Sequence, residues 1–329
     1  MSKRPLALLL GITGDLAFAA GCLLLALRRH SPTLNPDIIL YNDGTLLPHD
    51  ESLLRTLGAR PVLFVKPEGA FNPDAVRKFS YLTLARLEGL LMLETYSTVL
   101  WLDVDTAIQD DIAPLTTYGP FSLALEDPCF TESGKGLKAR VNISGPVPEL
   151  DLEAPNINSG VLVLQDSLPN PEGMYRQCMD WFRAYAPYLN YMDQGVLNLL
   201  AQQFQRETPE LFSFIPHDRF NAHPRNPAAQ RAAIVHAFGA YKLWDDGLTR
   251  CSFPEWERDY FRWLDMGGSP WQGKIENEEY LEGGAFFMLA RLHKLAESAE
   301  GMLHAQQKEL ESERALRMRL EKTLKKLSS

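Results

Sequence analysis

The sequence predicts an α/β fold in which strands and helices alternate along the chain. Short apolar runs recur, segments with apolar residues at helical spacing lie between them, and Gly, Asp and Thr mark the turns. Strands that are joined by helices usually pair in parallel, because the crossover returns the chain to the same end of the sheet. We therefore expect a largely parallel sheet covered by helices.

The N-terminal part of the chain supplies the first strands of this sheet. Residues 6–11 form an apolar run, Thr13, Gly14 and Asp15 form a turn, and residues 16–29 have helical spacing. The further strands predicted before residue 103 are 37–41, 61–65 and 98–102. The helices predicted between them are 51–57 and one long helix over 74–94.

The second part of the chain continues the alternation. Further strands are predicted at 121–125, 161–164 and 234–237. Helices are predicted at 174–185, 194–203 and, in "ERDYFRWL", at 257–264. Pro- and Gly-bearing connections around 145–155 separate them.

Composition limits the class of protein. The chain has 329 residues, 45% of them hydrophobic, and its net charge of -9 argues against a nucleic-acid-binding function. Four widely separated cysteines without C-x-x-C spacing suggest neither a zinc site nor disulfides, which favours a reducing, cytoplasmic compartment. The apolar N-terminus imitates a secretion signal, but Asp15 interrupts it. No other apolar run reaches the 18 or so residues of a membrane span.

The predicted organisation has three parts. Residues 1–265 form the α/β body, the polar and Gly-rich residues 266–284 form a linker, and residues 285–329 form an amphipathic or coiled-coil helix. Its leucine stripe and its basic end suggest either self-association or contact with a membrane surface, which would place the protein at the inner face of a membrane.

Two acidic residues directly follow the apolar run in "VLWLDVDTAI", residues 99–108. In an extended chain Asp103 and Asp105 point to the same side, so both can approach one cation. Open α/β sheets bind their ligands at the carboxyl ends of strands. A metal site and an ordinary strand-end turn are both open from these residues alone.

Four stretches occur in a fixed order: "LDVD" at 102–105, "NINSGVLVL" at 156–164, "YMDQGVLN" at 191–198 and "HAFGAYKLW" at 236–244. This series resembles glycosyltransferase family 8, the group that includes glycogenin and bacterial lipooligosaccharide galactosyltransferases, over most of residues 1–265. The resemblance implies the GT-A fold, a Rossmann-like mixed sheet that binds a nucleotide sugar between flanking helices.

The resemblance implies a divalent metal ion as cofactor, usually Mn²⁺, bound by Asp103, Asp105 and His236. Two hard oxygen donors with one imidazole suit Mn²⁺ or Mg²⁺ better than Zn²⁺. Taken without its neighbours Gly239 and Lys242, His236 would more often be an ordinary surface or core histidine, and with them the metal ligand is favoured.

The resemblance also implies a binding site for the diphosphate of the donor. Gly239 would allow a close backbone approach, and Lys242 would supply a positive charge. Leu243 stands where the family usually has proline, so the rigidity of this loop is in question. Arg86 matches a basic position directed toward the nucleotide, although a lone arginine on a helix usually faces solvent.

The remaining motif positions correspond to the nucleoside and the donor sugar. Thr13, Gly14 and Asp15 occupy the turn where the family binds uridine, but their residue types differ from the family's, so a UDP-linked donor follows from the resemblance alone. The positions that line the donor sugar are Asn158, Asp193 and Gln194, with Gln194 nearest the anomeric carbon. Asp193 and Gln194 also fit a helix N-cap and its first turn.

The resulting hypothesis is a metal-dependent retaining transferase that moves a hexose from a nucleotide sugar to an acceptor, such as a polysaccharide, a lipid-linked glycan or a protein. Gln194, Asp193 and Lys242 are the candidate catalytic residues. One alternative is a phosphatase of the haloacid dehalogenase type, which also uses D-x-D but prefers Thr or Val where this chain has Ala107. Another is a non-catalytic protein that acts through its helical tail.

Overall fold

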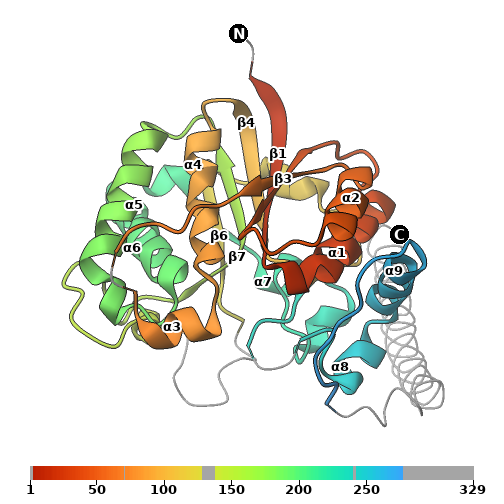
Figure 1. Cartoon of the computed structure of the whole chain (residues 1–329). Helices are drawn as coiled ribbons and strands as arrows, with labels where there is room; N and C mark the ends of the chain where they lie inside the picture. Colours follow the sequence, from red (N-terminus) through yellow and green to blue (C-terminus); the bar gives the residue numbers. More distant parts are fainter. Residues whose placement is uncertain (1–2, 70, 128–137, 240–241, 277–329) are drawn as a thin grey trace, which may run out of the picture. The chain divides into compact units, whose positions relative to one another are not determined.

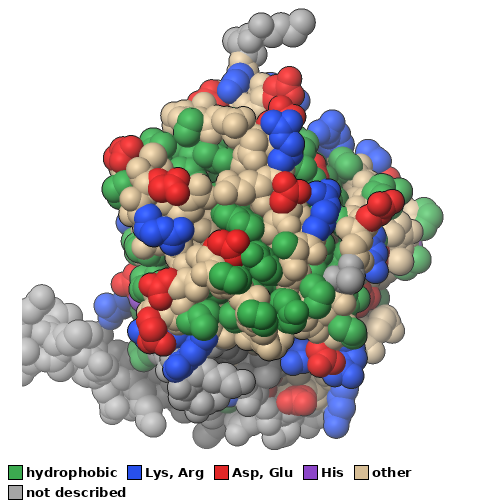
Figure 2. Space-filling model, turned by 90° about the vertical axis from the view of Figure 1, so that its left-hand side faces the viewer, with side chains coloured by type: hydrophobic (Ala, Val, Ile, Leu, Met, Phe, Trp, Pro, Cys, Tyr) green, Lys and Arg blue, Asp and Glu red, His purple; other side chains and the backbone are tan. Residues whose placement is uncertain are grey.

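The computed structural model describes residues 3–69, 71–127, 138–239 and 242–276 (Figure 1). Residues up to Ile275 form one compact unit. On the face shown in Figure 2, acidic and basic side chains of the described residues are interspersed with apolar ones rather than gathered by sign.

Seven strands form the main sheet, in the order β3-β2-β1-β4-β7-β6-β8. They are β1 (Arg4–Ile12), β2 (Asp37–Asn42), β3 (Ala59–Leu63), β4 (Tyr96–Leu102), β6 (Phe121–Leu125), β7 (Ile157–Gln165) and β8 (Phe212–Ile215). Strands β3, β2, β1 and β4 are parallel, and β7 runs antiparallel to both β4 and β6. The short strands β5 (Thr106–Ile108) and β9 (Ile234–His236) form a separate antiparallel pair.

Helices cover both faces of the main sheet (Figure 1). They are α1 (Ala17–His30), α2 (Pro48–Thr56), α3 (Pro73–Lys78), α4 (Glu88–Met92), α5 (Pro171–Tyr185), α6 (Met192–Glu207), α7 (His217–Phe220), α8 (Gly247–Ser252) and α9 (Pro254–Asp265). Shorter 3-10 segments include η1 (Gly14–Leu16), η2 (Tyr81–Leu87) and η5 (Ala139–Asn142).

Side chains of β1 alternate between the two faces of the sheet and so contribute to two separate hydrophobic cores. Leu8 and Leu10 of β1 pack with α1 and α9, whereas Ala7 and Leu9 pack on the other face with the residues of η2, α5 and α6. All four side chains are fully buried. A strand that is apolar on both faces reads as a continuous hydrophobic run, which explains the sequence of residues 6–10.

The structure confirms the α/β class and the mixed sheet that the resemblance implied, and it corrects several details. The predicted helix over 74–94 is wrong: it is divided into α3, η2 and α4. Phe79 is extended, and the Ser80 side chain accepts a hydrogen bond from the N–H of Leu82, which starts a new 3-10 segment. The pairing is parallel from β3 to β4 and between β6 and β8, and β7 is the antiparallel strand of the mixed sheet.

The first part of the segment predicted as a linker is packed on the body. The ring of Trp271 lies 5.7 Å from that of Phe18 and 6.1 Å from that of Trp244, centroid to centroid. The N–H of Ser269 donates to Asp50 at 2.9 Å. A Gly-rich composition therefore did not mean a free connection here. Residues 277–284 and the predicted tail helix, 285–329, lie outside the described residues.

Among the described residues, no helix has the length and apolar character needed to cross a membrane. Cys22, Cys178 and Cys251 are buried free thiols.

Candidate active site

The two acidic residues of the D-x-D stretch lie directly after β4, beside the start of β7. The N–H of Asp103 donates to the carbonyl of Gly160 at 2.9 Å, which holds the D-x-D turn against β7. After Asp105 the chain forms β5, whose first residue, Thr106, pairs with His236 at the end of β9. This strand pair brings together groups that are 131 residues apart in the sequence, 236 against 105.

Asp103, Asp105 and His236 form one cluster, in which one ligand atom of each lies within 4.8 Å of the others. The Nε2 atom of His236 is 3.0 Å from an oxygen of Asp105 and 3.7 Å from one of Asp103. The aspartate side chains are 25% and 15% exposed, so solvent can still reach the cluster. Two oxygen donors and one imidazole fit a hard divalent cation.

The two carboxyl groups have different electrostatic surroundings. Burial raises the pKa of Asp103, and the nearby Asp105 adds to this, although Arg86 opposes it. Burial acts in the same direction on Asp105, but the positive charges of Lys242 and His236 outweigh it and hold that pKa below its usual range. Asp105 is therefore the more firmly ionised of the two.

Asn221 orients the histidine of the cluster. Its Oδ1 atom lies 2.8 Å from Nδ1 of His236. Because an amide oxygen can only accept, Nδ1 carries a proton in this contact, and Nε2 is the ring nitrogen that faces the aspartates. Sequence reasoning missed Asn221, since nothing in its local sequence connects it with a residue 15 positions away.

Gly160 provides the space that His236 occupies. A Cβ atom at this position would lie 2.0 Å from Cε1 and 2.5 Å from Nδ1 of the imidazole. The glycine of the "NINSG" stretch is therefore required by the close approach of His236 to β7.

Arg86 is buried and joins the metal cluster to the start of α6. Its guanidinium donates to Asp103 at 2.9 Å and lies 3.1 Å from Asp193, each aspartate being contacted by a different nitrogen. It also lies 4.9 Å from the centre of the Trp101 ring. Only 2% exposed, Arg86 does not lie on the solvated face that a lone helical arginine usually occupies.

Asp193 and Gln194 lie in the first turn of α6, but neither is its N-cap. That position belongs to Tyr191, and no side chain caps the helix there. The alternative of a plain N-cap is therefore wrong for Asp193. Gln194 is held at its carbonyl end by Ser159, whose N–H and hydroxyl both donate to it at 3.4 Å.

Asn158 and the segment at 239–242 complete the predicted set. Asn158 accepts from the N–H of Gly160 at 2.9 Å. Gly239 has φ +86°, a conformation that favours glycine. The ammonium group of Lys242 pairs with Asp105. Leu243, in place of the family's proline, is fully buried.

The first turn is organised separately from the metal cluster. Thr13 donates to Asp15, and the N–H of Gly14 donates to Thr45 at 2.8 Å. In the described part of the chain, neither Thr13 nor Asp15 has a hydrogen bond or ion pair with the cluster. The structure therefore connects the predicted metal residues with Lys242, Arg86 and Asp193, but the described contacts do not link Gly239 or the predicted nucleoside residues to them.

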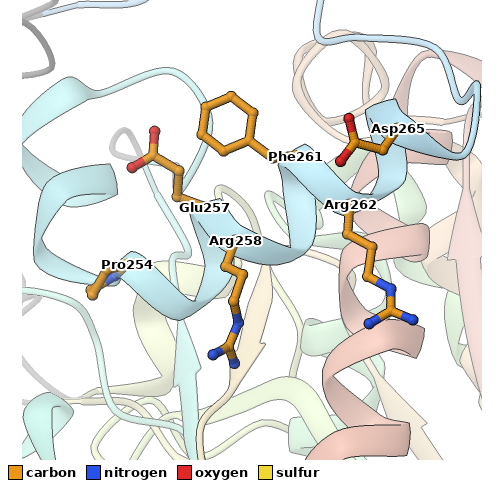
Figure 3. A pocket seen from close by; sticks show the side chains of 6 residues that line it. All are labelled: Pro254, Glu257, Arg258, Phe261, Arg262 and Asp265. Atoms are coloured by element: carbon orange, nitrogen blue, oxygen red, sulfur yellow. The ribbon is translucent and has the colours of Figure 1, made fainter.

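A pocket away from this cluster lies along α9 (Figure 3). Its lining residues, Pro254, Glu257, Arg258, Phe261, Arg262 and Asp265, all come from this one helix. With exposed charges of both signs and no convergent metal-type ligands among them, it is a weaker candidate for chemistry than the cluster at β4.

Residues 62–247 match the family model of glycosyl transferase family 8, and the chain belongs to this family. It is therefore a glycosyltransferase of GT-A fold, and the phosphatase alternative is wrong. No curated protein sequence matches the chain.

Solved structures show the same fold at low sequence identity. The bifunctional glycosyltransferase WbbM is 14% identical with a TM-score of 0.58, over 81% of this chain but only 52% of its own length. The galactosyltransferase LgtC, solved with donor and acceptor sugar analogues, is 16% identical with a TM-score of 0.54, over 79% of this chain and 99% of its own. GlyE of Streptococcus pneumoniae is 15% identical with a TM-score of 0.51, over 83% and 66%.

Proposed function

We propose that this chain is a metal-dependent, retaining hexosyltransferase whose donor is a nucleotide sugar linked to UDP. The observation that carries the proposal is the cluster of Asp103, Asp105 and His236. Lys242 pairs with Asp105, and buried Arg86 pairs with Asp103. A site with this balance of charges suits a diphosphate bridged to the protein by a divalent cation.

Asp103, Asp105 and His236 would hold Mn²⁺ or Mg²⁺, which as a Lewis acid would stabilise negative charge on the leaving diphosphate. Lys242 supplies a second positive charge for the same group, and its effect is largest as the glycosidic bond breaks. Arg86 keeps Asp103 oriented through a charge-assisted hydrogen bond.

Asp193, Gln194 and Asn158 are proposed to bind the donor sugar. Arg86 connects Asp193 to Asp103, so the sugar subsite and the metal cluster share one buried ion-pair network. Retention of the anomeric configuration is proposed from family membership. The acceptor would be a glycan, lipid-linked or protein hydroxyl, as the family's chemistry suggests.

The test is a thermal-shift screen of UDP-glucose, UDP-galactose and UDP, each with and without MnCl2. A ligand that binds the native state raises the melting temperature, and the proposal expects this rise to require manganese. Asp105→Ala should abolish the manganese-dependent rise and nearly all transfer, since lost charge stabilisation of this kind costs about 2.7–4 kcal/mol in the transition state.

Asp74→Ala is a matched control, because Asp74 is an exposed carboxylate paired only with Arg77 among its described contacts. It should behave as wild type. Manganese-independent binding by wild type, or full transfer by Asp105→Ala, would contradict the proposal.

A further inference from the structure

A second buried carboxyl group lies close to the proposed sugar subsite. Glu126 directly follows β6 and is 7% exposed. Its N–H donates to the carbonyl of Asn156 at 3.0 Å, which fixes its backbone beside the start of β7. The described residues place no Lys or Arg in an ion pair with it, and the side chains they place in contact with the carboxyl are neutral.

Those neutral groups are side-chain amides. Asn156 donates to Oε2 of Glu126 at 3.2 Å, and Gln194 donates to the same oxygen at 3.4 Å. Asn142 and Asn198 both donate to Oδ1 of Asn156, and the Asn198 amide also donates to the carbonyl of Gln194 at 2.9 Å. The amides come from η5, the start of β7 and α6, so the network spans three segments.

This network determines which way the Gln194 amide faces. At one end, the N–H of Ser159 is a donor only, so it must face the amide oxygen of Gln194. At the other end, Oε2 of Glu126 and Oδ1 of Asn142, 3.1 Å away, accept from the NH2 group. An amide turned by 180° would set its oxygen against these two acceptors and its NH2 against a backbone donor.

We propose that Glu126 is a positioning residue that fixes the orientation of the Gln194 amide in the donor-sugar subsite. The inference rests on the proposed function, because the sugar subsite is assigned there. Glu126 acts through Gln194 and the amide network. Burial raises the pKa of Glu126 to about 8, so the carboxyl is largely protonated at neutral pH and needs no counter-charge in this pocket.

If the Glu126 carboxyl had a purely structural role, its variants would behave differently. Its removal would lower stability and would weaken nucleotide binding and turnover together. A positioning residue predicts a fall in turnover while the affinity for manganese and UDP, which depends on the cluster at β4, stays unchanged. A Gln side chain at position 126 keeps an oxygen that can accept from Gln194, so E126Q should restore function where E126L does not.

The experiment measures hydrolysis of UDP-galactose and UDP-glucose with MnCl2 by wild type, E126Q, E126L and E126A, and the binding of UDP with MnCl2 by calorimetry. We expect kcat to fall at least tenfold in E126L and E126A and less than threefold in E126Q. The dissociation constant for UDP should stay within twofold of wild type in all of them.

Q202L is a matched control for stability. Gln202 lies on α6, the helix that carries Gln194, and is 5% exposed against 7% for Glu126. Its side chain accepts from the N–H of Asp151 at 2.8 Å and donates to the carbonyl of Asp151 at 3.0 Å. It should lower the melting temperature while leaving kcat within twofold. A further experiment compares the kcat of the double variant E126L/Q194A with that of Q194A alone. The two values should be equal, because the side chain through which Glu126 acts is already absent in Q194A.

The outcomes separate the two proposals. Wild type that binds neither UDP nor the UDP-sugars overturns the proposed function and this inference with it. Wild type that binds and turns over, with wild-type kcat in E126L and E126A, overturns this inference alone. So does a loss of UDP affinity that matches the loss of kcat, or full additivity with Q194A. E126A keeps the comparison valid if E126L does not fold, because Ala cannot overpack the pocket.

Discussion

At the scale of single residues, Lys242 occupies a position in which it would compete with a metal ion for Asp105. Its ammonium group pairs with one carboxylate oxygen while His236 contacts the other. A divalent cation on Asp105 must therefore displace or share this pair. We expect Lys242→Met to bind manganese several-fold more tightly than wild type in the absence of nucleotide, because the competing cation is gone. Its turnover should nevertheless fall, since the leaving diphosphate loses a positive charge.

Manganese titrations followed by calorimetry measure the first effect. Lys138→Met is the control, because Lys138 is exposed and pairs with Glu153 away from the cluster. Weaker manganese binding in Lys242→Met would mean that Lys242 supports the metal site rather than competing for it.

Glu126 should make stability depend on pH. Burial raises its pKa to about 8, and the bonds from Gln194 and Asn158 only partly oppose this. An unfolded glutamate ionises near pH 4.3. Between about pH 4.5 and 8 the folded chain therefore keeps a proton that the unfolded chain releases, and the free energy of unfolding falls as pH rises, by at most about 1.4 kcal/mol per pH unit from this group.

The comparison is between wild type and E126Q in urea unfolding at pH 5 and pH 8. The free energy of unfolding of wild type, relative to E126Q, should be lower at pH 8 than at pH 5. A constant difference between the two proteins would show that Glu126 is already ionised at pH 5.

At the scale of elements, Gly160 is the residue of β7 that leaves space for the imidazole of His236. The Cβ atom of an alanine would lie 2.0 Å from the imidazole, a separation that requires His236 or the strand to move. We expect Gly160→Ala to weaken manganese binding at least tenfold, because the histidine can no longer face both aspartates. Calorimetric titration with MnCl2 measures this.

Gly89→Ala in α4 is the control for Gly160→Ala. Its added methyl would meet only apolar side-chain atoms, at 3.0 to 3.5 Å. It should bind manganese like wild type, and equal binding by Gly160→Ala would show that the imidazole can shift without leaving the site.

Some elements were predictable because their signal is local. The continuous apolar run of β1 and the period of α1 gave bounds within two residues of those observed, residues 6–11 against 4–12 and 16–29 against 17–30. The segment 74–94 was not, because 3-10 and α-helical turns bury apolar residues at similar spacing and only the Ser80 cap separates them.

The candidate site likewise contains residues that could be predicted from the sequence and residues that could not. The "LDVD" motif and "HAFGAYKLW" could be identified as family motifs, and the structure brings their Asp103, Asp105 and His236 together. Asn221 and Glu126 carry no motif of their own. Their roles arise from the β5–β9 pair and from contacts among β6, β7 and α6, which no local pattern encodes.

At the scale of the whole molecule, the site draws on residues from Arg86 to Lys242, so it depends on the assembled body. The body does not end with α9. Trp271 packs against Phe18 and Trp244, the indole N–H of Trp263 donates to the carbonyl of Ser269 at 2.9 Å, and Tyr260 accepts from the N–H of Trp271 at 2.9 Å. These contacts tie residues 268–271 to α1 and α9.

We therefore expect two truncations to differ. A chain ending at residue 276 should retain the melting temperature and the manganese affinity of the full chain, because every described contact of the body is kept. A chain ending at residue 265 loses the packing of Trp271 and the Ser269–Asp50 hydrogen bond, together about 2–4 kcal/mol, and should melt about 4–8 °C lower. Light scattering of the full chain and the 276-residue chain then tests the proposed self-association of residues 285–329, and a liposome-binding assay tests the membrane alternative. If the 276-residue chain fails to fold, the tail belongs to the body and the proposed division of the chain is wrong.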